Sequence, residues 1–270
     1  MLNRLRKYLQ NMAPQGIALA YSGGADSTLL LAVLGEMRRK HPFPLVALTM
    51  RTVLQDTQEM TEAEELAAKF GVEQKVFGFN PFSLEEVRHN RTDRCYHCKK
   101  AIFTQFKDYA AANELKYLLD GTNADDLSAY RPGRKALNEL GMVSPLAELG
   151  ITKTEIRRMS AELGLPTSSK PAAPCLATRF EYDTLLDDAA VRRVADGERI
   201  IKETFPRIKD VRLRVHGNLA RIEARKEDLP LIAAQAKEIS EKIKELGFDF
   251  ITLDLEGFRS GSFDTGLKQN

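Results

Sequence analysis

The chain of 270 residues has only three cysteines and no long apolar run. A small, odd number of cysteines argues against a disulfide framework. The lack of about 18 consecutive apolar residues argues against a transmembrane helix. The first residues, MLNRLRKYLQNM, lack the apolar core and the small-residue cleavage site of a signal peptide. We therefore expect a cytoplasmic protein with reduced thiols and no membrane partner.

The sequence also lacks a large net charge, since its 40 Lys and Arg residues nearly balance its 38 Asp and Glu residues, and the formal charge is +2. No strong overall field calls for nucleic acid as a partner. Residues 183–270 carry 16 basic and 17 acidic side chains, so this part has no basic surplus for RNA binding. Hydrophobic residues make up 43%, as in ordinary globular proteins. We expect a small-molecule substrate and no nucleic acid.

Short apolar runs alternate with helical patterns through the first two thirds of the chain. Strands are expected at 16–22, 44–51, 74–79 and 116–122, and helices at 26–40, 57–71 and 99–115. Strands that alternate with helices of this length predict an α/β fold with a doubly wound parallel sheet.

The pattern changes after about residue 182. A helix is expected over 187–204, followed by two alternating runs about a turn at 216–218, a helix over 229–245 and a strand over 248–256. This order predicts a second, smaller α+β domain. The predicted domains are 1–182 and 183–270.

The strongest motif is YSGGADST, residues 21–28, which joins an apolar strand to a helix. Glycines there let backbone N–H groups surround phosphate oxygens, and the helix dipole favours an anion. A carboxylate in this loop is placed to hold Mg²⁺, and the hydroxyls add donors. A plain Gly-Gly turn without a ligand is the alternative. The predicted ligands of ATP and Mg²⁺ are Ser22, Gly23, Gly24, Asp26, Ser27 and Thr28.

A second turn, LLDGTNADD, follows the fourth expected strand at 118–126. Gly121 is expected to close on the nucleotide, while Asp125 and Asp126 serve Mg²⁺, orient substrate or remain loop carboxylates. The first loop has neither the GK[ST] of a Walker A loop nor a GxGxxG fingerprint. It resembles the SGGxDS loop of the PP-loop ATP pyrophosphatases. That resemblance implies that the loop grips the pyrophosphate of ATP while a substrate oxygen attacks the α-phosphate.

The three cysteines leave several interpretations open. Cys95 and Cys98 form a C-x-x-C in DRCYHCKK, and Cys175 lies far downstream in PCLATRF. They could be buried core residues, although the neighbours of the pair are polar. They could hold structural zinc with His97 or His89 as fourth ligand. A redox pair with Cys175 as persulfide carrier would suit a tRNA-thiolating enzyme.

Further segments narrow the resemblance to one family. The chain resembles the LarE family of ATP-dependent sulfur transferases in RCYHCKK, YRPGRKALNELG, SPLAELGITKTEIR, PCLATRF, VRLRVHGNLARIE and LDLEGFRSG. This resemblance covers essentially the whole chain. It implies that the carboxylates of pyridinium-3,5-biscarboxylic acid mononucleotide are adenylated and converted to thiocarboxylates. It also implies a sulfide donor and a homo-oligomer. A tRNA-thiolating enzyme and a non-catalytic adenine-nucleotide binding module remain the alternatives.

The resemblance assigns roles to the cysteines. In one type of LarE protein the cysteine equivalent to Cys175 gives up its sulfur and becomes dehydroalanine. In the other type three cysteines hold a [4Fe–4S] cluster, and thiolates are its usual ligands. The presence of Cys95, Cys98 and Cys175 together resembles the second type.

The resemblance also implies a substrate site. Arg212 and Arg214 alternate on one face of an expected strand, where two guanidinium groups suit a phosphate. An exposed strand face paired with carboxylates such as Glu223 is the alternative. The predicted catalytic residues are Cys175, Asp26 and Arg179. The predicted substrate-binding residues are Thr178, Arg179, Glu198, Arg212, Arg214, Glu223 and Arg259.

Overall fold

The computed structural model describes all residues except 56, 128–132, 172–173, 209, 260 and 264–270. The chain forms two compact units, one of Met1–Asn80 with Asp93–Ala172 and one of Pro81–Thr92 with Ala173–Asn270. The boundary expected between residues 182 and 183 remains a prediction about domains. By their contacts, the segment 81–92 and the region around Cys175 group with the later part of the chain.

The first unit is built around a parallel sheet of four strands in the order β3-β2-β1-β4. The strands are β1 (Ile17–Ala20), β2 (Leu45–Arg51), β3 (Glu73–Gly78) and β4 (Tyr117–Leu119). The helices are α1 (Leu2–Gln10), α2 (Ala25–Lys40), α3 (Thr57–Lys69), α5 (Arg94–Ala112), α6 (Gly133–Leu140), α7 (Pro145–Glu148) and α8 (Lys153–Glu162). The predicted doubly wound α/β fold is confirmed.

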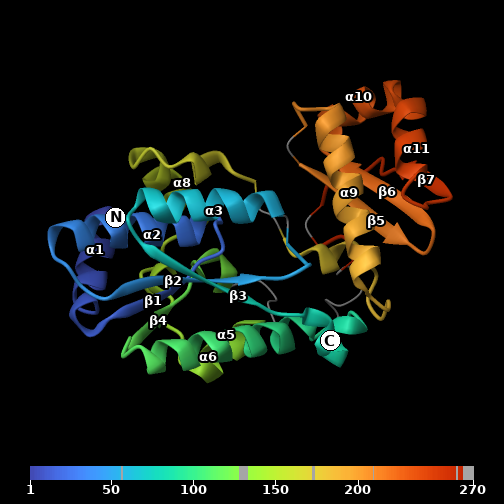
Figure 1. Ribbon diagram of the computed structural model, residues 1–270. Coiled ribbons are helices and arrows are strands. Elements are labelled where there is room, and N and C mark those ends of the chain that lie inside the picture. The colour runs from blue at the N-terminus through green and yellow to red at the C-terminus, as the bar shows by residue number, and fades with distance from the viewer. Residues whose placement is uncertain (56, 128–132, 172–173, 209, 260, 264–270) are drawn as a thin grey trace. The chain divides into compact units, whose positions relative to one another are not determined.

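Strand residues alternate between two apolar cores, one on each face of the sheet. Ile17 and Leu19 of β1 pack in the core that includes α1, α2 and α8. Ala18, between them, packs in the core that includes Phe106 and Ala110 of α5. This alternation follows from the two-residue period of a strand. Figure 1 shows α2, α3 and α8 on one face of the sheet and α5 and α6 on the other.

The second unit contains a sheet of three strands in the order β5-β6-β7. Strands β5 (Val211–His216) and β6 (Leu219–Ala224) form the expected antiparallel hairpin, and β7 (Phe250–Leu253) pairs parallel with β6. The helices are α4 (Glu85–Arg88), α9 (Asp188–Thr204), α10 (Leu229–Ala234) and α11 (Ala236–Lys244). The helix expected over 229–245 is broken at Gln235, whose φ of −111° and ψ of 27° are not helical.

One helix begins earlier than the sequence indicates. We expected a helix from residue 99, but α5 begins at Arg94 and includes both Cys95 and Cys98. The polar RCYHC stretch shows no apolar periodicity, and no side chain caps this helix end. Asp93 at the N-cap position is a usual start signal, but no apolar periodicity follows it directly. As a result, the C-x-x-C lies in the first two turns of a helix of 19 residues. No helix in the described part of the chain is long and apolar enough to cross a membrane.

Candidate functional site

The phosphate-loop motif connects the carboxyl end of β1 to the first turn of α2. Gly23 has a φ of 72°, in the left-handed region that glycine adopts without strain. Gly24 precedes the helix in an extended conformation, and Thr28 N–H makes the first helical bond to its carbonyl at 2.9 Å. The N–H groups of the first turn of a helix lack intrahelical acceptors. Such groups, here at the carboxyl edge of the sheet, are suited to an anion.

Two serine hydroxyls give the loop its shape. Ser27 Oγ donates to the Gly24 carbonyl at 3.2 Å and accepts from Ser22 N–H at 3.3 Å. The hydroxyls of Ser22 and Ser27 lie 3.3 Å apart, and Ser22 Oγ accepts from Gly24 N–H at 3.4 Å. The predicted ligands Ser22, Gly23, Gly24 and Ser27 are therefore brought together.

Thr28 lies deeper than a phosphate ligand would. Its side chain is fully buried, beneath the exposed Ser22. The neighbouring Tyr21 is also buried, and burial raises the pKa of its phenol to about 12. The role predicted for Thr28 in nucleotide binding remains a prediction.

The second predicted turn packs directly against the phosphate loop. A Cβ added to Gly121 would lie 3.1 Å from the backbone nitrogen of Ser27, so the backbones of these two segments are in close contact there. Buried Asp120 holds the turn by accepting from Thr122 N–H at 2.6 Å. Asp126 accepts from Asn123 N–H at 3.2 Å. Gly121 therefore lies beside the helix end that carries Ser27.

The structure adds a lysine to this site. Lys153, at the start of α8, places its Nζ 2.7 Å from each carboxylate oxygen of Asp26. The backbone N–H of Lys153 donates to Asp125 Oδ2 at 2.8 Å. Thr152 begins the helix in a capping box with Glu155. The T-x-x-E pattern could have predicted that helix start. The contact with a carboxylate 127 residues away could not be predicted from local pattern.

Cys95 and Cys98 share one face of α5, since residues three apart lie one above the other on a helix. Both side chains are half-buried. Because β3, α5 and β4 form a crossover between parallel strands, α5 runs back along the sheet and begins at its carboxyl edge. The pair is therefore at the same edge as the phosphate loop.

Cys175 belongs to the second unit and is exposed. It precedes the short 3₁₀ helix Leu176–Arg179. The buried Arg179 guanidinium donates from Nη1 to the carbonyl of Pro174 at 3.0 Å and to Thr178 Oγ1 at 2.9 Å. Thr178 Oγ1 in turn donates to the Cys175 carbonyl at 2.8 Å. Arg179 and Thr178 therefore fix the turn that presents the thiol.

The other side of Arg179 is paired with Glu198 of α9. Arg179 Nε and Nη2 donate to the two carboxylate oxygens at 2.7 and 3.1 Å, and both side chains are buried. Glu198 Oε1 also accepts from Leu213 N–H of β5 at 3.0 Å. This one carboxylate therefore links the cysteine turn, the long helix and the hairpin.

Arg212 and Arg214 are buried beside this pair rather than exposed on a strand face. Arg214 Nε donates at 3.0 Å to Glu223, which has no exposed surface, and its Nη1 donates to the Thr178 carbonyl at 2.6 Å. Burial is the main cause that lowers the pKa of both arginines. The nearby charge of Arg179 lowers the pKa of Arg212 further.

Buried charges of both signs meet in this cluster. Three guanidinium groups, of Arg179, Arg212 and Arg214, are buried with the carboxylates of Glu198 and Glu223. Asp254, whose side chain is 8% exposed, lies 3.6 Å from Arg221 and from Arg259. The carbonyl of half-exposed Arg259 accepts from Arg214 Nη2 at 3.4 Å.

In the part of the chain that the structure describes, no three His, Cys, Asp or Glu side chains are grouped to hold a metal ion. Cys95 and Cys98 lie in one unit and Cys175 in the other. Their convergence remains a prediction.

Comparison with known proteins identifies the family. A model described as a PP-loop domain matches residues 1–127. An uncharacterized protein of Synechocystis is 35% identical over 251 residues, which cover 92% of each chain. The pyridinium-3,5-bisthiocarboxylic acid mononucleotide synthase of Lactiplantibacillus plantarum is 33% identical over 255 residues, 94% of this chain and 90% of the relative. The chain belongs to the LarE family.

A third relative of this LarE protein comes from an archaeon. An uncharacterized protein of Methanocaldococcus jannaschii is 30% identical over 258 residues, 96% of this chain and 95% of the relative. The phosphate loop and the Gly121 turn lie within residues 1–127, which the PP-loop model matches. As a PP-loop protein of this family, it is an enzyme that uses ATP.

Proposed function

We propose that this LarE protein is an ATP-dependent sulfur transferase. It adenylates the carboxylates of pyridinium-3,5-biscarboxylic acid mononucleotide and converts them to thiocarboxylates. The observation that carries the proposal is the similarity, over 94% of this chain, to a synthase named for the bisthiocarboxylic acid product. The organisation of the phosphate loop and the exposed Cys175 support it.

The first step makes a carboxylate oxygen into a leaving group. A substrate carboxylate oxygen attacks the α-phosphorus of ATP, the bond to the β-phosphate breaks, and pyrophosphate leaves. The N–H groups of the Gly23-Gly24 turn and of the first turn of α2 hold the pyrophosphate oxygens. Mg²⁺ at Asp26 neutralises the charge that accumulates there.

Lys153 supplies a second cation for this step. Its ammonium pairs with both oxygens of Asp26 at 2.7 Å, and both side chains are partly exposed beside the loop. Asp26 would hold Mg²⁺, and the Lys153 ammonium beside it would pair with the phosphates of ATP. The ion pair therefore keeps both groups in place for the nucleotide.

The second step exchanges oxygen for sulfur. A sulfide sulfur attacks the carbonyl carbon of the acyl adenylate, the bond to the AMP oxygen breaks, and a proton leaves the sulfur. The guanidinium groups of Arg212 and Arg214 suit the phosphate of the mononucleotide substrate. Arg179 acts on this step by holding the Cys175 turn, and Glu198 holds Arg179.

The three cysteines fit a [4Fe–4S] cluster in their donor chemistry. Cys95 and Cys98 lie on one helix face, Cys175 is exposed, and none is enclosed in a core. In our proposal these three thiolates hold the cluster. When bound, it supplies an iron that carries the exogenous sulfide.

A second version of the reaction is favoured by one observation, the exposure of Cys175 on a turn fixed by Arg179. In this version the Cys175 thiolate attacks the acyl adenylate and AMP leaves. The bond from Cβ to sulfur then breaks in an elimination that removes the Cα proton. The products are a thiocarboxylate and dehydroalanine at position 175.

The experiment compares the two versions in anaerobically purified protein given substrate, MgATP and sulfide. Mössbauer and visible spectra report a cluster, and mass spectrometry reports the state of Cys175 after turnover. We expect an intact Cys175 and more than one product per chain. Cys95→Ala should abolish turnover, while Thr104→Ala, further along α5, should not change it. Loss of H₂S from Cys175, or an active Cys95→Ala variant, would refute the cluster version.

A further inference from the structure

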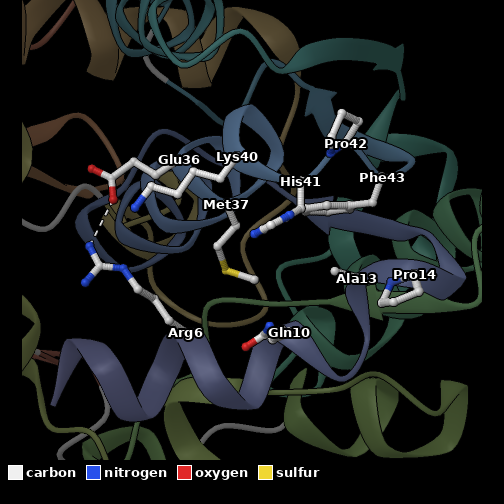
Figure 2. A pocket seen from close by; sticks show the side chains of 10 residues that line it. All are labelled: Arg6, Gln10, Ala13, Pro14, Glu36, Met37, Lys40, His41, Pro42 and Phe43. Carbon is white, nitrogen blue, oxygen red and sulfur yellow. Dashed lines mark hydrogen bonds and ion pairs between the residues drawn. The ribbon is translucent and has the colours of Figure 1, made fainter.

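The first unit contains a cavity of about 380 Å³ away from the nucleotide loop. It lies between α1, the end of α2 and the residues that lead into β2 (Figure 2). The phosphate loop is at the other end of α2, and a helix of 16 residues is about 24 Å long. The cavity is therefore separate from the site described above.

The floor of the cavity is apolar and offers flat surfaces. Met37 lies in the middle of the lining side chains, with Phe43, Pro42, Pro14 and Ala13 on one side (Figure 2). Phe43 is 9% exposed, so its ring belongs to the packed wall. Aromatic and proline faces accept a flat ring, and a thioether packs favourably against ring edges. A volume of this size lies within the range of small-molecule pockets.

Polar groups lie at the mouth of the cavity. Arg6 and Glu36 neutralise each other in an ion pair of 2.9 Å. Across the described ranges, the side chains of Gln10, Lys40 and His41 have no hydrogen-bond or ion-pair partner, although all three line the cavity. They leave hydrogen-bonding groups and a positive charge available to a ligand.

Charge around the mouth favours an anion. The carboxyl end of a helix carries about half a negative charge and by itself repels anions. Here the last turn of α2 contains Arg38, Arg39 and Lys40, which outweigh that partial charge. A cationic ligand would meet like charges, and a neutral one would leave Lys40 without a counterion.

We propose that this cavity binds a small aromatic carboxylate. The ring packs between Met37 and Phe43, and the carboxylate accepts hydrogen bonds from Lys40 and His41. No covalent step is involved. The site is independent of the sulfur-transfer reaction and of the nucleotide.

The test uses 2-naphthoate as the probe and the neutral 2-naphthamide as its isosteric control. Titration of the full chain is followed by calorimetry and by NMR of ¹³C-methyl methionine. The chain has seven methionines, and Met37→Leu identifies the Met37 signal. We expect 2-naphthoate to shift the Met37 signal saturably and to bind about tenfold more tightly than the amide, because the Lys40 ammonium attracts the carboxylate and not the neutral amide. ATP should not displace it.

Two variants and a matched control locate the site. The double variant Lys40→Glu, His41→Glu should weaken 2-naphthoate binding at least about tenfold, since it reverses the charge of exposed Lys40 and adds a negative charge at exposed position 41. Arg39→Glu reverses a charge on the same turn outside the lining and should change the affinity less than about twofold. Met37→Trp should fill the cavity and abolish binding.

Several results would overturn the proposal. They are an unmoved Met37 signal, equal affinity for the amide, displacement by ATP, or equal effects of the Arg39 and the double variants. If sedimentation shows that the chain self-associates and that Met37→Trp prevents this, while 2-naphthoate leaves Met37 unmoved, the cavity is a subunit contact and the proposal is wrong.

Discussion

Replacing Glu198 by Gln should destabilise the second unit more than any surface substitution. Glu198 neutralises buried Arg179, with two contacts of 2.7 and 3.1 Å, and accepts from Leu213 N–H. The amide keeps one acceptor but places an NH₂ group against a guanidinium donor. It also removes one of the carboxylates that are buried with Arg179, Arg212 and Arg214.

Removing one partner of a buried ion pair costs about 3–5 kcal/mol. A whole domain is stable by only about 5–15 kcal/mol. The matched control is Glu203→Gln on the same helix. Glu203 contacts Arg199 at 3.3 Å with both side chains more than half exposed, so this change should cost at most about 0.5 kcal/mol.

Hydrogen exchange of peptides from α9 and the β5–β6 hairpin is the suitable assay, because a chain of two units need not unfold in one transition. The chain also has no tryptophan to report unfolding by fluorescence. Exchange protection in these peptides should fall by several kcal/mol in Glu198→Gln, while peptides from β1 and α2 keep theirs. A Glu198→Gln variant that behaves like Glu203→Gln would refute the view that this carboxylate holds the cluster together.

Three further predictions concern the first unit. Lys153→Ala should weaken MgATP binding about tenfold in calorimetry, because it removes a cation beside the loop. The control Lys170→Ala, which breaks the pair with Glu62 at 2.8 Å, should leave MgATP binding unchanged. An equal effect of both variants would contradict the role of Lys153. Gly121→Ala should also reduce MgATP affinity, since the added Cβ would lie 3.1 Å from the Ser27 nitrogen. The control Gly78→Ala places its Cβ in open space and should leave the affinity unchanged. Unchanged affinity in both variants would show that the Gly121 turn moves at no cost to MgATP binding. Burial raises the pKa of Tyr21 from 10.0 to about 12. Above pH 10 the phenol therefore loses its proton in the unfolded state before it does so in the folded state. The free energy of unfolding falls as the pH rises to 12 and beyond, by about 3 kcal/mol in total. Denaturation of Tyr21→Phe between pH 9 and 12 should lack this part of the loss, and parallel curves would contradict the prediction.

The sequence predicted the parallel sheet well because buried strands and amphipathic helices leave strong local patterns. All four strands of the first sheet lie where GIALAYS, PLVALTMR, QKVFGF and KYLLDGT placed them, to within a few residues. The phosphate loop was predictable for the same reason, since its glycines and hydroxyls act within eight residues.

Contacts between distant segments were not predictable. Nothing near Lys153 indicates a carboxylate 127 residues earlier. Arg212 and Arg214 could have been exposed, but distant segments bury them: Arg212 lies over the ring of Phe258 and Arg214 over the ring of Phe263. The start of α5 was missed because its first turn is polar and lacks a side-chain cap.

The segment 81–92 leaves the first unit after β3, joins the second unit and returns before α5. Fully buried Asn90 of this segment donates to the carbonyls of Phe180 and Glu181 at 3.2 and 2.7 Å. A gene exchange with one breakpoint near residue 172 would therefore combine the second unit of one parent with the 81–92 segment of the other. We expect such chimeras to be viable only when the Asn90 contacts are compatible. Because the acceptors are backbone carbonyls, such a chimera needs an asparagine at position 90 and the same backbone path at 180–181, although the two segments are far apart in the gene.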